Sequence, residues 1–248
     1  MTSALLLLAV FLTAALSAVF GMAGGLVLMG LLALLFPVPV AMVTHGLVQS
    51  VSNGWRAFLL RDFILWRPLA WYALGALGAV AVLISVSITL PAAWLFIVLG
   101  LVPALVWVPA DRFRLDFTRR IDAVACGLTV TGLNTIAGVS GPLLDVFAQN
   151  AETDRRSIVA TKAASQVAAH AVKIVYYVAP ALTSGAAPAA WLLVLALGAS
   201  VLGTSLGARA LHRLSEASFR RWTKGLVTVI GATYLARGIW MLSSGGGS

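Results

Sequence analysis

Long apolar stretches, separated by short polar, glycine-rich or proline-containing breaks, dominate the chain. Many of these stretches approach the roughly 20 residues that a helix needs to cross a bilayer. They show no strand-type alternation, which favours transmembrane helices over a barrel. The breaks are marked by Pro37, Pro39, Pro91 and Pro188 and by glycines near 21–25 and 138–141. The expected apolar segments are 3–20, 23–36, 40–60, 68–88, 92–109, 121–137, 141–150, 157–180, 189–209 and 219–242.

Basic residues gather in every second connection between these segments. The basic connections hold Arg61 and Arg67; Arg112, Arg114, Arg119 and Arg120; Arg155 and Arg156; and Arg209, Arg213, Arg220, Arg221 and Lys224. The connections near 37–39, 89–91 and 181–188 contain neither Lys nor Arg. The positive-inside rule therefore predicts a cytoplasmic position for the first set and an external position for the second, with both termini periplasmic. Arg237 is an exception that would snorkel from the outer end of the last helix.

The composition indicates a lipid environment and excludes several classes of protein. The chain of 248 residues is 60% hydrophobic and 10% charged, whereas a soluble domain carries about 25% charged residues. Because the net charge of +9 resides in short loops between apolar segments, we expect no nucleic-acid partner. The single cysteine, Cys126, excludes an internal disulfide and a multi-cysteine metal site. The first 20 residues lack the basic start of a cleaved signal peptide, and 243–248 resemble an expression linker.

The two halves of the chain resemble each other. At an offset of 117 residues, Gly21 aligns with Gly138, Gly24 with Gly141, Leu26 with Leu143, Thr44 with Thr161, and Gln49 with Gln166. After a six-residue insertion, ALGALG at 73–78 resembles ALGASV at 196–201. By the charge rule, the segment that starts near 40 begins outside, and its counterpart near 157 begins inside. The halves are therefore expected to be inverted repeats, which is a transporter architecture.

The expected fold is an all-α polytopic membrane protein with inverted-topology duplicated halves. Each half would contain a re-entrant or broken helical hairpin plus three crossing helices, because an odd number of crossings inverts the second copy. The segment after Gly141 has about ten residues, too few to span a bilayer, and is interpreted as the returning half of a hairpin. We assign 1–109 to the first repeat, 110–120 to a basic cytoplasmic loop and 121–242 to the second repeat.

Two long segments carry polar side chains at helical spacing. In residues 160–173 they are Lys162, Gln166, His170 and Lys173, and Tyr177 extends this face by one turn. In the counterpart at 43–56 they are His45, Gln49, Asn53 and Arg56, at the same four steps. A charge at the centre of a bilayer costs about 2.5–3.5 kcal/mol on insertion scales, so several in one helix need a reason. We infer that the two stripes face each other across a hydrated, electropositive cavity.

The two glycine-rich breaks, FGMAGG at 20–25 and AGVSGP at 137–142, form a second candidate element. Glycine permits a sharp turn, and Pro142 suits the first turn of a helix. Each break would leave a half-helix N-terminus whose free N–H groups and dipole favour an anion. The alternative is a contact between small residues of packed helices. The side chains that would add hydrogen bonds here are Ser17, Asn134 and Ser140.

Several of these polar residues have a second interpretation. Lys162, Arg56 and Lys173 lie near enough to helix ends to snorkel toward an interface. His170 would also fit a hydrogen-bonded packing role, and the two glutamines would fit interhelical contacts. Asp145 is a carboxylate in a short apolar segment; it would either neutralise Lys162 or Lys173 or carry a proton. Pairing is the preferred interpretation, because an unpaired carboxylate in a membrane is costly.

The GMAGG and GVSG breaks, the duplicated halves, the chain length and the Thr…Gln helices resemble the TauE/SafE sulfite exporters of the toluene sulfonate uptake permease group. The resemblance covers nearly the whole chain. It implies secondary transport of sulfite, sulfonates, sulfoacetate or related small organic anions across the bacterial inner membrane, with a substrate region on the two breaks and the two Thr…Gln helices. Family members usually have a GxGGG-type first break, of which residues 21–25 are a reduced version, and another glycine where this chain has Pro142.

The leading hypothesis is a secondary transporter of a small anion that works by alternating access, without a cofactor, as a monomer or homodimer. Coupling to a proton or to sodium is open, and His170 is a candidate for proton coupling. His45 and Lys162 follow their threonines at equivalent positions and would be paired anion contacts. The candidate substrate-binding residues are Gly24, Gly25, Thr44, His45, Gln49, Asn53, Asn134, Ser140, Gly141, Thr161, Lys162, Gln166 and His170, with Asp145 and Lys173 for coupling or charge pairing.

Two other classes of function stay open. A metal or other cation carrier would use His45, His170 and Asp145, although the nearby lysines would repel a cation. An intramembrane serine protease would use Ser140, in its GVSG context, with His170 as the base. The repeat counterpart of Ser140 is Ala23, which favours a structural turn over a nucleophile.

Overall fold

The computed structural model describes residues 2–20, 23–109, 112, 114–211 and 216–244, and over these ranges it contains helices and no strands. The all-α prediction is therefore confirmed for the described part of the chain. Gly21 and Met22 of the first break, residues 110–111 and 113 of the basic loop, Arg213 and residues 245–248 lie outside the described residues.

The first half begins with α1 (Thr2–Phe20) and α2 (Ala23–Leu35), which lie on either side of the first break. It continues with α3 (Val38–Leu59), the 3₁₀ turn η1 (Arg61–Phe63), α4 (Trp66–Val86), α5 (Ala92–Leu101) and the 3₁₀ helix η2 (Val102–Trp107). Pro37 precedes α3 and Pro91 precedes α5, so two of the proline breaks coincide with helix starts. Proline suits these positions because its fixed φ is already helical and its missing N–H is not needed there.

The second half contains α7 (Arg120–Ala137), α8 (Gly141–Ala148), α9 (Arg155–Thr183), α10 (Ala190–Leu211) and α11 (Glu216–Ser243). Two predicted segments differ from the structure. The segment 92–109 is split into α5 and η2, and the change falls next to Pro103, which cannot donate an α-helical hydrogen bond. The predicted segment 157–180 continues to Thr183, because α9 accommodates Pro180 within its last turns.

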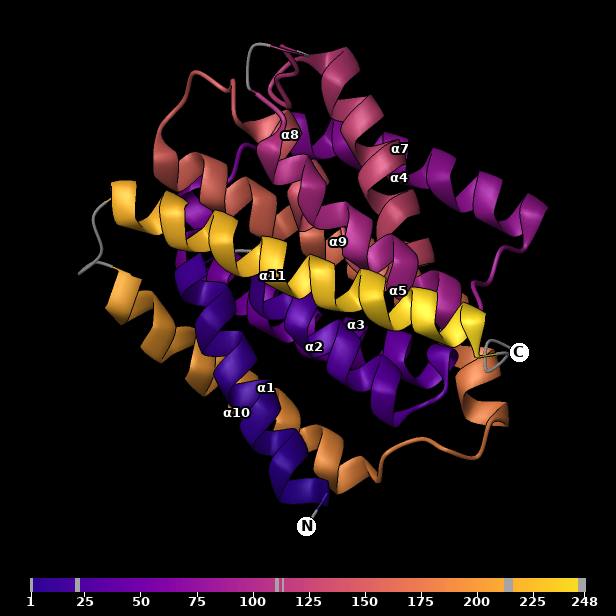
Figure 1. Cartoon of the computed structure of the whole chain (residues 1–248). Helices are drawn as coiled ribbons and strands as arrows, with labels where there is room; N and C mark the ends of the chain where they lie inside the picture. The colour runs from indigo at the N-terminus through magenta and orange to yellow at the C-terminus, as the bar shows by residue number, and fades with distance from the viewer. Residues whose placement is uncertain (1, 21–22, 110–111, 113, 212–215, 245–248) are drawn as a thin grey trace.

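The helices pack in four principal pairs (Figure 1). The first helix, α1, lies along α10 at one side of the molecule, and α4 lies along α7 at another. Helix α5 packs against α11, which crosses the front of the view. Helices α3 and α9 contact each other and both lateral pairs, because α3 also touches α10 and α9 also touches α4 and α7. The two helices with polar stripes therefore form the centre of the bundle.

The outer surface of the bundle is apolar, as expected for helices that contact lipid. Leu77 is 65% exposed, Ile84 68% and Val175 75%. Soluble monomers rarely expose large contiguous apolar patches to water. In the described residues, three helical stretches are long and apolar enough to cross a membrane: Trp66–Val86, Ala190–Arg209 and Lys224–Ser243. The central helices α3 and α9 are continuous, but polar residues that line the interior interrupt their apolar sequence.

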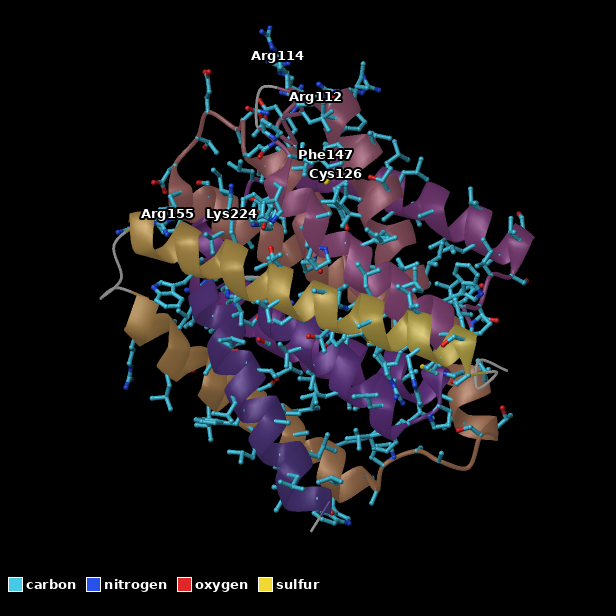
Figure 2. All side chains as sticks on the ribbon, viewed as in Figure 1. Arg112, Arg114, Cys126, Phe147, Arg155 and Lys224 are labelled. Atoms are coloured by element: carbon cyan, nitrogen blue, oxygen red, sulfur yellow. The ribbon has the colours of Figure 1, made fainter. Side chains whose placement is uncertain are left out.

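Four basic residues and the chain termini lie at different ends of the bundle. Arg112, Arg114, Arg155 and Lys224 lie in the upper and left part of Figure 2, whereas Figure 1 marks the N-terminus at the bottom and the C-terminus at the right. The Lys224 ammonium lies 5.0 Å from the centre of the Trp107 ring. Such cation–aromatic pairs are typical of membrane–water interfaces. We refer to the end with Arg112, Arg114, Arg155 and Lys224 as the basic end.

Candidate functional site

A cavity of about 700 Å³ lies between α3 and α9. Its walls come from α1, the start of α2, α3, the second break, α8 and α9, so both halves of the chain contribute. The polar residues that line it are Ser17, His45, Gln49, Asn53, Arg56, Ser140, Asp145, Asp154, Arg155, Arg156, Lys162, Gln166 and His170, together with Gly25 and Gly141. The predicted meeting of the two polar stripes is thus observed in space.

The cavity opens toward the basic end and is closed near the middle of the bundle. Arg155 and Arg156 are exposed at its mouth. Farther in, the side chains of Lys162 and Asp145 are still 29% and 35% exposed. At the inner end, the exposed fraction falls to 1% for His45 and 3% for His170. Solvent therefore has access to the lysine and the carboxylate from one side of the protein.

Cationic side chains outnumber carboxylates in this cavity. Arg56, Arg155, Arg156 and Lys162 line it together with Asp145 and Asp154. Asp145 forms an ion pair with Lys162, one of the two partners that the sequence left open. The Nη2 atom of Arg56 is buried and has no hydrogen-bond partner among the described residues. An anion in the cavity would satisfy such a donor, because a buried guanidinium without a partner is unfavourable.

His45 on α3 connects the inner end of the cavity to the first break. Its Nε2 lies 2.9 Å from the carbonyl oxygen of Gly25, and its Nδ1 lies 2.8 Å from the Nζ of Lys173. Since a carbonyl can only accept, Nε2 must carry the hydrogen in this arrangement. The ring also contacts the ring of His170 edge to face, with centroids 5.5 Å apart. His45 therefore links α2, α3 and α9 at the point where the cavity ends.

Lys173 does not snorkel toward an interface, which was one of its predicted roles. Its side chain is fully buried. The ammonium donates to His45 and also to the carbonyl oxygen of Gly138, 2.8 Å away. Lys173 therefore binds the second break to α3 from a position beneath the cavity, and it does not line the cavity itself.

The second break is a sharp turn held by defined contacts. Gly138 has φ +80° and ends α7, with its N–H bonded to the carbonyl of Asn134 at 2.9 Å. This left-handed conformation is one that glycine adopts without strain. Ser140 then precedes α8, and Pro142 occupies its first turn, as predicted from the sequence. The Ser140 hydroxyl lies 3.5 Å from Gln166 Nε2, which brings α9 to the start of α8.

Several predicted site residues lie outside the cavity lining. Thr44 and Thr161 are buried, and the Thr161 hydroxyl accepts from the N–H of Leu65 at 2.9 Å, which is a structural contact between α9 and the connection before α4. Gly24 is buried against the backbone of α1, where its lack of a side chain permits close packing. Asn134 contacts Nδ1 of His170 at 3.3 Å from behind the cavity wall.

Conversely, Arg56 lines the cavity, although snorkelling toward an interface was its second interpretation. The signal was present, because Arg56 occupies the fourth position of the α3 stripe after His45, Gln49 and Asn53. Its closeness to the end of the helix made the interface the simpler interpretation. The packing of α9 against α3, and the cavity that the two helices enclose, show that the guanidinium faces inward.

The geometry gives little support to the two alternative chemistries. In the described part of the chain, no group of three or more His, Cys, Asp or Glu side chains is placed to hold a metal ion. Asp145 is directed to Lys162 rather than to the two histidines. The Ser140 hydroxyl is near Gln166 and His170 contacts Asn134, so the described contacts contain no Ser140–His170 hydrogen bond of the kind a serine protease requires.

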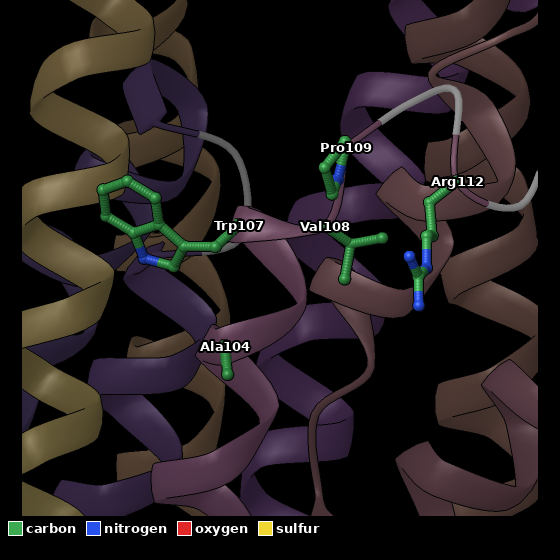
Figure 3. Close-up of a pocket in the computed structure, with 5 residues that line it drawn as sticks. All are labelled: Ala104, Trp107, Val108, Pro109 and Arg112. Atoms are coloured by element: carbon green, nitrogen blue, oxygen red, sulfur yellow. The ribbon is translucent and has the colours of Figure 1, made fainter.

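A second hollow, of about 370 Å³, lies at the surface of the basic end (Figure 3). It is lined by Ala104, Trp107, Val108, Pro109 and Arg112. Figure 3 shows one charged side chain, Arg112, among these otherwise apolar residues. It lacks the convergent polar groups of the central cavity, which is therefore the candidate functional site.

A comparison of the sequence with protein-family models identifies the family of the chain. Residues 6–234 match the model of the sulfite exporter TauE/SafE family. The chain belongs to this family. TauE/SafE proteins are membrane transporters of the sulfite and anion exporter type rather than enzymes, which agrees with the apolar bundle and its positively charged interior. Searches among curated proteins and among solved structures give no match.

Proposed function

We propose that this TauE/SafE protein is a secondary transporter of a small sulfur-containing anion, such as sulfite, a sulfonate or sulfoacetate, and that it works by alternating access. The observation that carries the proposal is the central cavity, in which Arg56 and Lys162 face a water-accessible space between α3 and α9. A guanidinium and an ammonium suit the oxygens of a sulfite or sulfonate group, because charge-assisted hydrogen bonds are stronger than neutral ones.

Neutral donors would complete the anion site. Gln49, Gln166 and Ser140 line the same cavity next to the two cations. The start of α8, at Gly141, also borders the cavity, and the first N–H groups of a helix have no partner within the helix. These groups would bind sulfonate oxygens in a fixed orientation, while the cations provide most of the attraction.

The pattern of helix contacts supports the inverted repeat. In the alignment of the two halves, α1 corresponds to α7 at the 117-residue offset, and α4 corresponds to α10 after the six-residue insertion. Exchange of the two halves therefore converts the α1–α10 contact into the α7–α4 contact, and both are observed. The same exchange converts the α3–α9 and α5–α11 contacts into themselves. Many transporters that work by alternating access are built from halves with such a two-fold relation.

In this proposal the structure represents the state that is open to the cytoplasm. The basic end would face the cytoplasm of a bacterial cell and the termini would be periplasmic, in agreement with the charge rule. Lys173 and Tyr177, which are both fully buried and follow the cavity-lining residues along α9, would close the passage to the other side. Transport to the periplasmic side would require the Lys173 contacts with His45 and Gly138 to open.

A binding screen on the purified protein tests this function. Methanesulfonate, sulfite and sulfoacetate should raise the unfolding temperature of the wild-type protein, because a ligand at 100 times its dissociation constant stabilises the folded state by about 2.7 kcal/mol. Nickel and zinc ions, tested in the same screen, should not do so. Stabilisation by the metal ions but by none of the anions would favour the cation-carrier alternative and reject the proposed function.

Two matched variants locate the binding site. Lys162→Gln removes one charge-assisted contact, which is worth about 1.5–3 kcal/mol, and should weaken anion binding by roughly 10- to 100-fold. Lys224→Gln is the same change at a lysine that packs on Trp107 outside the cavity, and it should bind like the wild type. Equal affinities in both variants would remove Lys162 from the site.

A further inference from the structure

The ion pair between Asp145 and Lys162 has a consequence for coupling, given the proposed anion transport on which this inference rests. Asp145 lies on the short helix α8 and Lys162 on α9, and both side chains are about one-third exposed within the cavity. In this state the Asp145 carboxylate already binds the Lys162 ammonium, which is the group that an anion would bind. An incoming anion must therefore compete with Asp145 for Lys162.

The competition is resolved if the carboxylate gains a proton. An ionised Asp145 would repel a sulfonate or sulfite held at the same ammonium, because the two negative charges would lie within a few ångströms of each other. A neutral Asp145 carboxylic acid leaves the ammonium to the anion and can itself donate a hydrogen bond to it. The protonated residue thus changes from a competitor into a part of the binding site.

We propose that Asp145 is the proton carrier of this transporter, and that one proton on Asp145 and one anion on Lys162 move together. The proton comes from the water of the cavity and becomes bound to a carboxylate oxygen, and it returns to water on the opposite side. The empty site holds one carboxylate and one ammonium. The loaded site holds a carboxylic acid, an ammonium and a monoanion, so both forms carry the same net charge across the membrane.

The surroundings of Asp145 favour this assignment over the other titratable groups. The groups that line the cavity around it are Lys162 and His170 from α9, Arg56 and His45 from α3, and Asp154, Arg155 and Arg156 at the mouth. Both histidines are almost completely buried and each has a hydrogen-bond partner at Nδ1. Asp145 is in contact with solvent and with the proposed anion contact at the same time.

The second carboxylate of the cavity, Asp154, provides a matched control. Asp154 is exposed at the mouth and caps the start of α9 by accepting from the N–H of Arg156 at 3.2 Å. Asparagine also caps helices well, so Asp154→Asn should preserve the fold while removing the charge. Asp145→Asn likewise keeps the shape of the side chain and imitates the neutral state.

Proton uptake on anion binding is the first test. Purified protein in weakly buffered solution is mixed with sodium methanesulfonate, a permanently ionised anion, and a pH indicator records the protons bound. The wild type and Asp154→Asn should each take up a proton for each anion, whereas Asp145→Asn should bind methanesulfonate without proton uptake. Binding without proton uptake by the wild type would overturn the proposal, as would an undiminished proton uptake by Asp145→Asn.

Transport in proteoliposomes is the second test, and it distinguishes a failure of proton coupling from a failure of anion transport. With one-to-one coupling, each unit of pH difference should accumulate labelled methanesulfonate about tenfold in wild-type vesicles. Asp145→Asn should exchange labelled for unlabelled anion but should not accumulate it. Sulfite can itself carry a proton. Labelled sulfite is therefore compared between the wild type and Asp145→Asn under the same pH conditions, so that this proton contributes equally to both. If the wild type exchanges either anion without responding to the pH difference, the coupling inference fails alone; if it binds and exchanges neither, the proposed function fails as well.

Discussion

The contact between α4 and α7 allows a sharp test of the packing that supports the cavity. Gly127 on α7 lies against the backbone of α4, where an added Cβ would collide with the carbonyl oxygen of Tyr72 and lie 2.8 Å from its carbonyl carbon. The same Cβ would lie 2.9 Å from the backbone nitrogen of Ala76. These are backbone atoms that cannot rotate away, so Gly127→Ala must separate the two helices.

The expected cost of Gly127→Ala is that of an overpacked core, about 1–3 kcal/mol. For a chain of this size, 1 kcal/mol corresponds to a change of about 2–4 °C in the unfolding temperature, so we expect a decrease of roughly 2–12 °C. Gly132→Ala, on the same helix, is the matched control, because a Cβ there meets no atom within 4 Å. It should stabilise the protein slightly, since alanine is preferred over glycine in helices by about 0.8–1 kcal/mol.

The assay uses the single cysteine of the chain. Cys126 is 1% exposed and adjacent to Gly127, so a thiol-reactive fluorescent dye should label it only when α4 and α7 separate. A labelling transition at lower temperature for Gly127→Ala, and an unchanged or higher one for Gly132→Ala, would agree with the observed contact. Equal transitions for the two variants would show that α4 and α7 do not approach as closely as described.

Three further predictions concern a tyrosine contact, the cavity and the orientation of the chain. Tyr234→Phe removes the hydroxyl that donates to the Leu26 carbonyl at 3.0 Å; it should cost about 0.5–1.5 kcal/mol in thermal unfolding and leave transport intact, and a loss of transport would contradict this purely structural role. In a Cys126→Ser background, Val159→Cys should react with a membrane-impermeant thiol reagent added at the basic end, because Val159 lines the cavity. Val175→Cys, which faces outward, should be protected by lipid. Equal reactivity of the two cysteines would indicate that the cavity is dry. Alkaline phosphatase fused after Ser243 should be active in whole bacteria, and an inactive fusion would place the C-terminus in the cytoplasm.

Much of the fold followed from the spacing of apolar residues and from prolines. The predicted segments agree with the helices because apolar runs of sufficient length and their breaks are local features of the chain. The split between α5 and η2 was missed, because the apolar pattern is continuous across Val102 and Pro103. Helix α9 accommodates Pro180. The local apolar pattern does not predict this, because it depends on the neighbouring helices.

The lining of the central cavity was predicted in part. Helical spacing correctly placed His45 and Gln49 on the same side of α3, and Lys162 and Gln166 on the same side of α9. Thr44 and Thr161 were grouped with them although each lies one position away, which turns its side chain by about 100° around the helix. The directions of Lys173 and Arg56 were not predictable, because they depend on how α9 and the second break lie against α3.

The central claim is that this TauE/SafE protein moves anions through the cavity between α3 and α9. Its most direct test is the flux of labelled sulfite and methanesulfonate into proteoliposomes that contain the wild type, Lys162→Gln or Lys224→Gln. We predict saturable flux for the wild type and for Lys224→Gln, and a flux at least about tenfold lower for Lys162→Gln at low anion concentration, because one charge-assisted contact is lost. Equal flux in all three, or no flux above that of protein-free vesicles, would contradict the claim.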